Sequence, residues 1–413
     1  MKRPSILYIT YGNMFRTTGF AEQVRAEVAE LARRGYPLTL LAFENYTEFS
    51  RQASGRLALD DLCRSAGARL VPVPTFAETR DSFRPLRRML DGAAMMLAAL
   101  ARRADILHAH HLTAIRLALS VGRLLRRPVV ADLHGVQAAE YLYGGASESD
   151  PAYRRFVDDE RRAVLDADLT FVVSEAFKRY VIDEYGAAED KILVTPSCAD
   201  TNEFRIDENA RAGIRAEIGV GDRPVIAFVG SAQGYHVFDE VLRFVQAARE
   251  IRPDVFALVL TTDPEAVRSA LSEADLGDSS AVRRVPHAEV PRWLNAADLG
   301  LLLREPSLVN AVASPVKAAE YLACGLPLAI SEGVGDLSAL VRQEKLGVVV
   351  ETLDGKAYAG AARRFFAGWE GSDREALRAR CRRAAVRRLS WESCMKTFDA
   401  AYRRLRPECF VEN

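Results

Sequence analysis

Short apolar runs alternate with helix-length segments along almost the whole chain, and this alternation strongly limits the folds that it can adopt. Continuous apolar runs are typical of strands buried on both faces of a parallel sheet. The segment from Gly19 to Gly35 has apolar residues at helical spacing, which is typical of a helix that covers such a sheet. Strands that alternate with covering helices predict the α/β class.

The apolar runs form two series. The first predicts strands at Ser5–Thr10, Pro37–Phe43, Arg69–Pro72, Ile106–His108, Val129–Asp132, Leu169–Ser174 and Lys191–Thr195. The second predicts strands at Val225–Val229, Phe256–Thr261, Ala281–Val285, Leu299–Leu303, Leu328–Ile330 and Gly347–Val350. A polar stretch lies between them, and the 413 residues exceed what one compact core usually holds. We therefore predict two doubly wound, Rossmann-like domains, residues 1–205 and 206–389, with ligands at the carboxyl ends of the strands.

One segment of the second series, Ser314 to Pro327, has the start and stop signals of a complete helix. Ser314 is placed to cap the helix, and Gly325 is placed to end it. Lys317 and Glu320 lie three residues apart, so both project from nearly the same face. Free amides and a lysine at a helix start attract a phosphate, and a carboxylate one turn later suits ribose hydroxyls. The alternative is an ordinary capped helix on which Lys317 and Glu320 form an exposed pair.

Charge and cysteine content limit the class of protein. Lys plus Arg equals Asp plus Glu at 56 each, so no overall attraction to nucleic acid is expected. The six cysteines have neither disulfide-framework nor metal-ligand spacing, which favours reduced thiols in a cytoplasmic protein. The short apolar run after the N-terminus does not suit a signal peptide, and no run reaches the roughly 18 apolar residues of a membrane span.

The segment from Arg84 to Arg103 has an apolar centre with arginines at both ends. It fits two structures: a helix packed on the sheet, or a helix that docks on an anionic membrane surface, which would be the inner face for a cytoplasmic protein.

The acidic and histidine motifs do not predict a metal site. Asp166-Ala167-Asp168 resembles a metal-binding motif in its letters, but it precedes its strand instead of following it. An Ala-Asp pair stands at the same place before three strands, at 104–105, 167–168 and 297–298, which indicates a structural role. His108, His110 and His111 are expected to be divided between the two faces of a strand, with no carboxylate close by.

Several segments, in order, carry a resemblance to a known family. They are Thr18–Val24, Leu31–Leu40, Ile106–His110, Val130–Gly135, Val173–Glu175, Phe228–Ser231, Ala319–Pro327 and Leu389–Trp391. Together they resemble the retaining nucleotide-sugar glycosyltransferases of the GT-B fold, family four (group 1). The resemblance implies two Rossmann-like domains that face a central cleft, an acceptor-binding first domain and a nucleotide-sugar-binding second domain. It also implies that the last helix, residues 390–413, crosses back to complete the first domain.

The resemblance also implies roles for single residues. Glu320 would accept hydrogen bonds from the donor ribose, and Lys317 would stabilise the departing nucleotide diphosphate. His134 would lie beside the transferred sugar and take part in catalysis. Donor contacts are further expected from Gly19, Gly230, Ser231, His287, Arg304 and Ser314, and acceptor contacts from one of His108, His110 and His111. Arg304 has the alternative of an exposed surface group.

Two positions depart from the family pattern. Val312 stands eight positions before Glu320, where the family often has a glutamate, and the segment Ser231–His236 lacks the usual arginine and lysine.

The sequence thus predicts an enzyme that transfers a sugar with retention from a nucleotide-diphosphate sugar to a small-molecule, glycan or lipid-linked acceptor. It predicts no metal and no cofactor beyond the donor, and no nucleic-acid partner. Two alternatives are a nucleotide-sugar epimerase, with Glu175 and His236 as candidate acid and base, and a non-catalytic nucleotide-sugar-binding protein.

Overall fold

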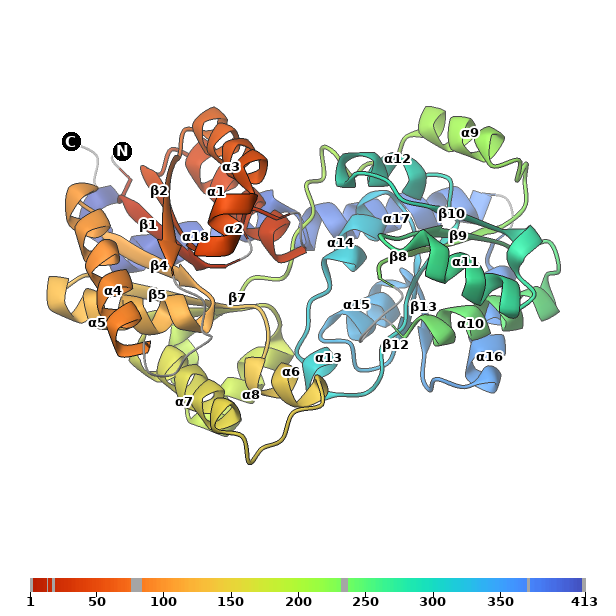
Figure 1. Cartoon of the computed structure of the whole chain (residues 1–413). Helices are drawn as coiled ribbons and strands as arrows, with labels where there is room; N and C mark the ends of the chain where they lie inside the picture. Colours follow the sequence, from red (N-terminus) through yellow and green to blue (C-terminus); the bar gives the residue numbers. More distant parts are fainter. Residues whose placement is uncertain are drawn as a thin grey trace. The chain divides into compact units, whose positions relative to one another are not determined.

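The computed structural model of the chain describes residues 3–12, 14–16, 19–75, 84–231, 237–369 and 372–410. The chain divides into two compact units, Met1–Pro196 with Cys394–Asn413, and Ser197–Ser393. These limits lie within several residues of those expected for the two domains. In each unit, helices cover both sides of a parallel sheet (Figure 1).

The first unit contains a seven-stranded parallel sheet in the order β3-β2-β1-β4-β5-β6-β7. Its strands are β1 (Ile6–Tyr11), β2 (Leu38–Asn45), β3 (Arg69–Thr75), β4 (Ile106–His110), β5 (Val129–Leu133), β6 (Leu169–Val172) and β7 (Ile192–Val194). Its helices are α1 (Gly19–Arg33), α2 (Tyr46–Arg51), α3 (Ala53–Ala66), α4 (Arg84–Ala101), α5 (Leu112–Leu125), α6 (Gln137–Tyr143), α7 (Pro151–Asp166) and α8 (Glu175–Tyr185).

The second unit contains a six-stranded parallel sheet in the order β10-β9-β8-β11-β12-β13. Its strands are β8 (Val225–Val229), β9 (Phe256–Leu260), β10 (Ser280–Arg283), β11 (Leu299–Leu302), β12 (Leu328–Ser331) and β13 (Gly347–Val350). Its helices are α9 (Glu208–Glu217), α10 (Phe238–Ile251), α11 (Pro264–Glu273), α12 (Val290–Leu294), α13 (Leu308–Ala311), α14 (Val316–Ala323), α15 (Leu337–Glu344), α16 (Gly355–Ala367) and α17 (Ser372–Arg388). Two apolar clusters lie on opposite faces of this sheet.

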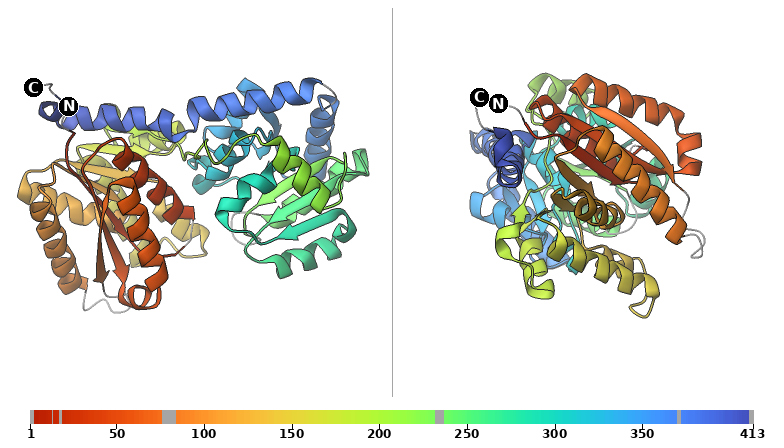
Figure 2. Two further views of the ribbon diagram at one scale, coloured as in Figure 1. Left: turned by 90° about the horizontal axis from the view of Figure 1, so that it is seen from above. Right: turned by 90° about the vertical axis from the view of Figure 1, so that its left-hand side faces the viewer.

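The last long helix, α18 (Trp391–Leu405), begins in the second unit and lies mostly in the first. In the first unit the Tyr402 hydroxyl lies 2.6 Å from Nδ1 of His108, and Phe398 packs against Phe171. Figure 2 shows this blue helix beside the red and orange elements of the first unit. Arg3 forms an ion pair of 2.7 Å with Asp399.

Each predicted strand is confirmed, with ends that differ by at most a few residues. The predicted α/β class with two Rossmann-like parallel sheets is confirmed as well. Parallel strands buried on both faces are continuous apolar runs, and this makes them easy to detect in the sequence.

The three Ala-Asp pairs have one structural role in common. Asp105 accepts a hydrogen bond from the Ser5 N–H, Asp168 from the Val129 N–H, and Asp298 from the Val225 N–H. The backbone N–H of each aspartate in turn donates to the backbone carbonyl of the residue whose N–H its side chain accepts, which is Ser5, Val129 or Val225. Each aspartate therefore fixes the start of its own strand to the start of the neighbouring strand, and the structural interpretation of the repeat is confirmed.

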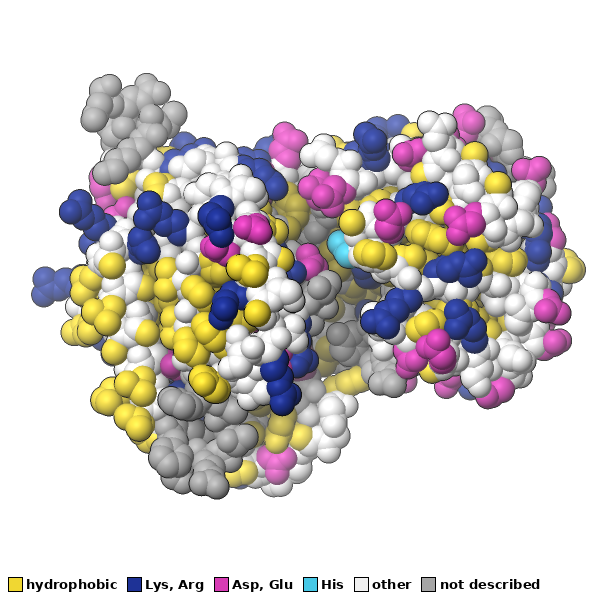
Figure 3. Space-filling view, turned by 45° about the horizontal axis from the view of Figure 1, so that its top comes forward, with side chains coloured by type: hydrophobic (Ala, Val, Ile, Leu, Met, Phe, Trp, Pro, Cys, Tyr) yellow, Lys and Arg dark blue, Asp and Glu magenta, His cyan; other side chains and the backbone are white. Residues whose placement is uncertain are grey.

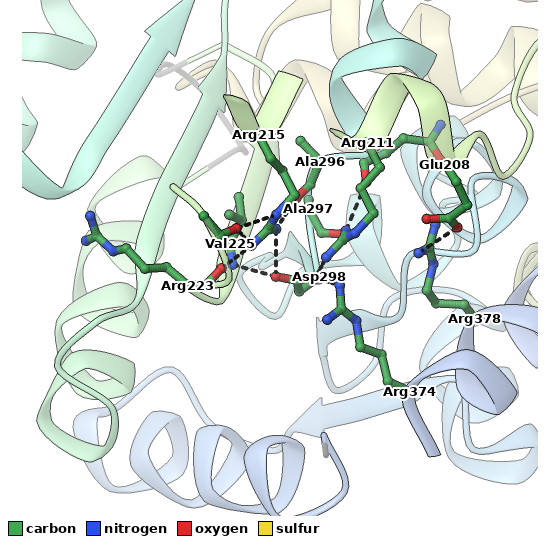
Figure 4. A network of polar contacts seen from close by, with 12 residues as sticks. Glu208, Arg211, Arg215, Arg223, Val225, Ala296, Ala297, Asp298, Arg374 and Arg378 are labelled. Atoms are coloured by element: carbon green, nitrogen blue, oxygen red, sulfur yellow. Dashed lines mark hydrogen bonds and ion pairs between the residues drawn. The ribbon is translucent and has the colours of Figure 1, made fainter. Parts of the chain in front are cut away.

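Asp298 differs from the other two because it is buried among arginines (Figure 4). Arg211 and Arg215 of α9 lie 2.5 Å and 3.3 Å from its carboxylate, and Arg374 of α17 lies 3.0 Å from it. The same two α9 arginines donate to the backbone carbonyls of residues 295–297. This network fixes α9 to the start of β11.

Two expectations from the sequence are corrected. Helix α14 begins at Val316 with Pro315 as its N-cap, so Ser314 is not the capping residue. Ser314 Oγ instead accepts a hydrogen bond of 3.1 Å from the Ser197 N–H, a contact across a long sequence separation. The cysteines are not all reduced thiols, because Cys198 and Cys394 are disulfide-bonded, whereas Cys63, Cys324 and Cys381 are free.

None of the helices in the described part of the chain combines the length and the hydropathy needed to cross a bilayer.

Candidate active site

The carboxyl edge of the second sheet carries most of the predicted donor-binding residues. β8 lies between β9 and β11, so the direction in which the chain adds strands changes between β8 and β11. Such a switch point is where doubly wound folds bind ligands. Gly230 and Ser231 follow β8, and Arg304 follows β11, so the structure brings these predicted residues to that point.

Glu320 is the central residue of this edge. Its side chain is buried, at 3% exposure, and lies on the second turn of α14. Lys317 Nζ lies 2.7 Å from Oε2, and His287 Nε2 lies 3.0 Å from Oε1. Burial opposes ionisation, but the charge of Lys317 and the hydrogen bond with His287 hold the pKa of Glu320 below its ordinary value. The alternative of an exposed surface pair is therefore wrong in one respect: Lys317 and Glu320 are paired, but the carboxylate of Glu320 is buried.

His287 begins the short 3₁₀ helix η5 (His287–Glu289) after β10. Its ring also lies beside that of Phe204, with centroids 5.6 Å apart. Its side chain is 37% exposed, so the imidazole reaches the surface while it contacts the buried carboxylate. The sequence predicted His287 and Glu320 as separate donor contacts, and the structure joins them.

Close packing fixes α14 beside the loop that follows β8. The Val229 N–H donates to the Tyr321 hydroxyl at 2.8 Å. A Cβ at Gly300 of β11 would lie 2.5 Å from the Tyr321 ring, so only glycine lets this ring pack flat against the strand. Gly325 has φ +71° at the end of α14, as expected of a helix-ending glycine, and a Cβ there would collide with Ile206.

Arg304 and Val312 both have buried side chains. The alternative of an exposed surface arginine at position 304 is therefore wrong. The Arg304 N–H donates to Ser331 Oγ at 2.7 Å, which orders the ends of β11 and β12 together. Val312 lies directly after α13, so the position of the family's first glutamate is apolar and enclosed here.

A second polar cluster lies at the carboxyl edge of the first sheet, around the buried Asp132 of β5. His134 Nε2 lies 3.2 Å from Asp132 Oδ1, and His108 Nε2 lies 3.5 Å from Oδ2. The Tyr8 hydroxyl donates to Oδ2 at 3.4 Å. The His110 and His134 rings lie 4.3 Å apart. His134 is the partly exposed member of this cluster, with its side chain at 25%.

The pKa values of the buried groups in this cluster are shifted in different directions. Burial would raise the pKa of Asp132, but His134 and His108 hold it well below its ordinary range. Burial and the neighbouring Asp132 raise the pKa of Glu27 well above its ordinary value, which favours the neutral form of this carboxyl. Burial lowers the pKa of His110 well below its ordinary value. A charged Asp132 thus faces the ring of His134.

The histidines of β4 differ from the expectation. His108 and His110 lie on one face, and a carboxylate is close, because Asp132 contacts the first and lies near the second. Two overlapping groups, Glu27–His108–Asp132 and His110–Asp132–His134, have ligand atoms within 4.8 Å of one another and so the spacing to hold a cation. The side chains of His108 and His110 are buried, which leaves them no surface for an acceptor.

Two further predicted residues lie at helix starts. His111 is the N-cap of α5, and its Nδ1 accepts from the Thr113 N–H at 3.3 Å. Gly19 opens α1 directly after residues 17–18, which lie outside the described part of the chain, as does His236.

Sequence reasoning missed Asp132 and Glu27. Both could have been found in the sequence, because each is an acidic residue within an apolar pattern. Asp132 lies in the strand β5, and Glu27 lies on the helix α1. Such a residue needs a buried partner.

Comparisons with known proteins point to one family of enzymes. A model described as Glycosyltransferase Family 4 matches residues 17–203, and one described as Glycosyl transferases group 1 matches residues 223–367. The D-inositol 3-phosphate glycosyltransferase of Acidothermus cellulolyticus is 29% identical over 316 residues, which cover 72% of this chain and 67% of the relative. The D-inositol 3-phosphate glycosyltransferase 1 of Catenulispora acidiphila is 28% identical, with 76% of each chain covered.

Solved structures with a similar fold include a glycosyltransferase from Rickettsia africae, with a TM-score of 0.74, 12% identity and 98% of each chain covered. Another is the Anabaena protein HepE in complex with UDP, with a TM-score of 0.72, 14% identity, and 96% of this chain and 99% of that chain covered.

Proposed function

The chain belongs to the family-four, group 1 glycosyltransferases, and we propose that it transfers a sugar from a nucleotide-diphosphate sugar to an acceptor hydroxyl or amine with retention of configuration. The observation that carries the proposal is the buried Glu320, whose two oxygens are held by Lys317 and His287 at the switch point of the second sheet. A buried carboxylate held in this way is ready to accept hydrogen bonds from two vicinal hydroxyls.

We propose that the ion pair between Glu320 and Lys317 separates when the donor binds, and that each side chain then contacts the donor. The ribose hydroxyls then donate to Glu320, while Lys317 turns from the carboxylate to the diphosphate. The free amides at the start of α14 and the buried guanidinium of Arg304 add positive charge for the same phosphates. Gly230 and Ser231 supply backbone close to them. Stabilisation of the leaving diphosphate grows towards the transition state, so these groups contribute to rate as well as to binding.

For the first unit we propose that His134 contributes to the transfer and that Asp132 is a positioning residue that acts through it. The charged Asp132 lies 3.2 Å from His134 Nε2, which favours a proton on that nitrogen and fixes the ring. The outward face of the imidazole then has a defined orientation towards the sugar.

We further propose that the reaction needs no metal ion, because Lys317, Arg304 and the α14 amides together can neutralise the leaving diphosphate. No covalent nucleophile is assigned, so attack on the same face as the leaving group accounts for retention. The departing phosphate oxygen then takes the acceptor proton.

The printed names of the relatives suggest the first substrates to test. Curated relatives are named D-inositol 3-phosphate glycosyltransferases, and HepE was crystallised with UDP and UDP-glucose. We therefore propose a UDP-sugar with a polyol phosphate as the first pair.

The test is nucleotide release from UDP-, GDP- and TDP-sugars, each with and without inositol 3-phosphate and other soluble polyols. Slow release that Glu320→Ala abolishes supports the proposal, and an α-linked product from an α-linked donor, identified by NMR, establishes retention. Saturable binding without release would instead favour a non-catalytic protein, for which the apolar Val312 is the motivating feature. Conversion of the donor sugar without an acceptor would favour an epimerase. The absence of both nucleotide release and saturable binding across the whole panel would disprove the transferase proposal.

A further inference from the structure

Helix α4 presents a stripe of large apolar residues to solvent and buries two charged residues, Arg87 and Asp91, against the protein. Leu86, Met89, Leu90, Leu97 and Leu100 are all exposed, with Met89 at 63% and Leu97 at 64%. Their spacing places them on one stripe of the helix. Arg87 and Asp91 are buried on the opposite face, where Asp91 accepts hydrogen bonds from the hydroxyls of Tyr11 and Thr75.

The neighbouring helix carries a further exposed leucine. α4 packs against α5, and Leu124 near the end of α5 is 70% exposed. Figure 3 shows apolar side chains gathered on the first unit, with Lys and Arg side chains and some Asp and Glu side chains beside them. Single exposed leucines are ordinary on a protein surface, but a continuous apolar stripe marks an interaction surface.

Arginines predominate in this part of the chain, and one of them, Arg116, pairs with Asp159 of α7 at 3.1 Å. Residues 84–127 contain nine arginines and two aspartates, Asp91 and Asp105, and Asp91 is buried. Arg102, Arg103, Arg123 and Arg126 are exposed at the ends of α4 and α5. The whole chain has no net charge, so this positive charge is local. Arginines at the ends of an exposed apolar helix complement a surface that is apolar inside and anionic outside, which is the surface of an anionic lipid bilayer.

We propose that α4 and the end of α5 form a docking face for an anionic lipid surface. The helix lies parallel to the membrane plane, with its leucines at the level of the acyl chains and its terminal arginines at the headgroups. Eighteen residues give a helix about 27 Å long, enough for several turns to contact the lipid at once. A second copy of the chain would cover apolar residues as well, but like charges would then face one another across the contact.

The proposal goes beyond sugar transfer, and its test needs neither donor nor acceptor. The full chain is sedimented with vesicles of phosphatidylcholine alone, and with vesicles of equal parts phosphatidylcholine and phosphatidylglycerol. We expect binding to the anionic vesicles that weakens with added salt. Leu90→Glu/Leu97→Glu is expected to lower the partition coefficient at least about tenfold. The control Tyr46→Glu/Leu57→Glu carries the same two charges on the exposed surfaces of α2 and α3, and is expected to bind as the unaltered chain does.

A second pair of variants tests the charges. Arg102→Ala/Arg123→Ala is expected to weaken binding about fivefold for each arginine removed, and Arg102→Lys/Arg123→Lys to retain it. All variants are expected to unfold at the temperature of the unaltered chain and to turn over soluble substrates unchanged. No binding to anionic vesicles, or equal binding by Leu90→Glu/Leu97→Glu, would overturn the proposal. So would a dimer in sedimentation velocity that the same double variant dissociates, because the face would then contact a second copy.

Discussion

His287 and Glu320, 33 residues apart in the chain, are in direct contact, with Nε2 of the imidazole 3.0 Å from Oε1 of the carboxylate. Lys317 holds the other oxygen, so the carboxylate is oriented before a donor arrives. This preorganisation places a charged acceptor in a buried position at the edge of the sheet.

Replacement of Glu320 by glutamine keeps the shape of the side chain and removes its charge. We expect kcat/KM for nucleotide release to fall by about ten- to a hundredfold, the value of one charge-assisted hydrogen bond. Glu332→Gln is the matched control, because Glu332 follows β12 in the same unit but is exposed and pairs with Arg342. Equal effects of the two substitutions would contradict the assigned role.

Lys317→Ala tests the charge that we assign to the leaving diphosphate. We expect kcat to fall and KM to rise, by about ten- to a hundredfold in kcat/KM, because the contact strengthens towards the transition state. EDTA is expected to leave the activity of the unaltered enzyme intact. Loss of activity with EDTA that magnesium or manganese restores would show that a metal neutralises the diphosphate instead.

The sequence predicted the strands well and the side-chain partners poorly. Apolar runs mark the strands because each strand depends on its own local pattern. The bond from the Ser197 N–H to Ser314, and the contact of His287 with Glu320, depend on how distant segments meet. The periodicity of a sequence carries no information about such tertiary contacts. The acidic residues of the first unit are an intermediate case. An aspartate within an apolar strand, such as Asp132, indicates that a buried partner exists, but the sequence does not show which residue that partner is.

Asp132 contributes stability with a defined pH dependence. Its pKa is well below the ordinary value in the folded chain, so the stabilisation is complete above about pH 4, the unfolded value, and is lost as the pH falls through the folded pKa. Asp132→Asn is expected to lower the free energy of unfolding by about 3 kcal/mol at neutral pH, because it removes a buried charge that accepts hydrogen bonds from its neighbours. Urea unfolding across the pH range measures this, and the exposed Asp158→Asn is the control. A difference from the unaltered chain that stays constant down to the lowest pH would exclude the assigned linkage.

Glu160 of α7 is expected to show the opposite dependence. It accepts hydrogen bonds from the Ala138 N–H at 2.9 Å and the Tyr185 hydroxyl at 2.8 Å, and burial raises its pKa to about 7. A raised carboxyl pKa means that stability is greatest below the unfolded value and declines as the pH rises through about 7. Glu160→Gln cannot ionise, while its amide can still contact both partners. We expect this variant to become more stable than the unaltered chain above neutral pH, by up to about 3 kcal/mol. Glu184→Gln, exposed on α8, is the control, and a parallel pH profile for Glu160→Gln and the unaltered chain would refute the prediction.

Asp298 and Asp168 accept the same kind of backbone hydrogen bond in different surroundings. Comparing them therefore separates the free energy of that hydrogen bond from the free energy of pairing with buried arginines. Each accepts the first N–H of a neighbouring strand, at 2.8 Å in both cases. Asp168 is exposed, so Asp168→Ala is expected to cost about 1 kcal/mol, the value of one hydrogen bond.

Asp298→Ala also leaves the buried guanidinium groups of Arg211 and Arg215 without their carboxylate, and we expect a cost of about 3–5 kcal/mol. Arg211→Met in the Asp298→Ala background is then expected to recover part of the loss, because it removes one of the uncompensated charges. Denaturant unfolding of the single and double variants measures all of these values. Equal costs for Asp298→Ala and Asp168→Ala, with no recovery in the double variant, would mean that the carboxylate of Asp298 acts on the strand alone and the arginines find other partners.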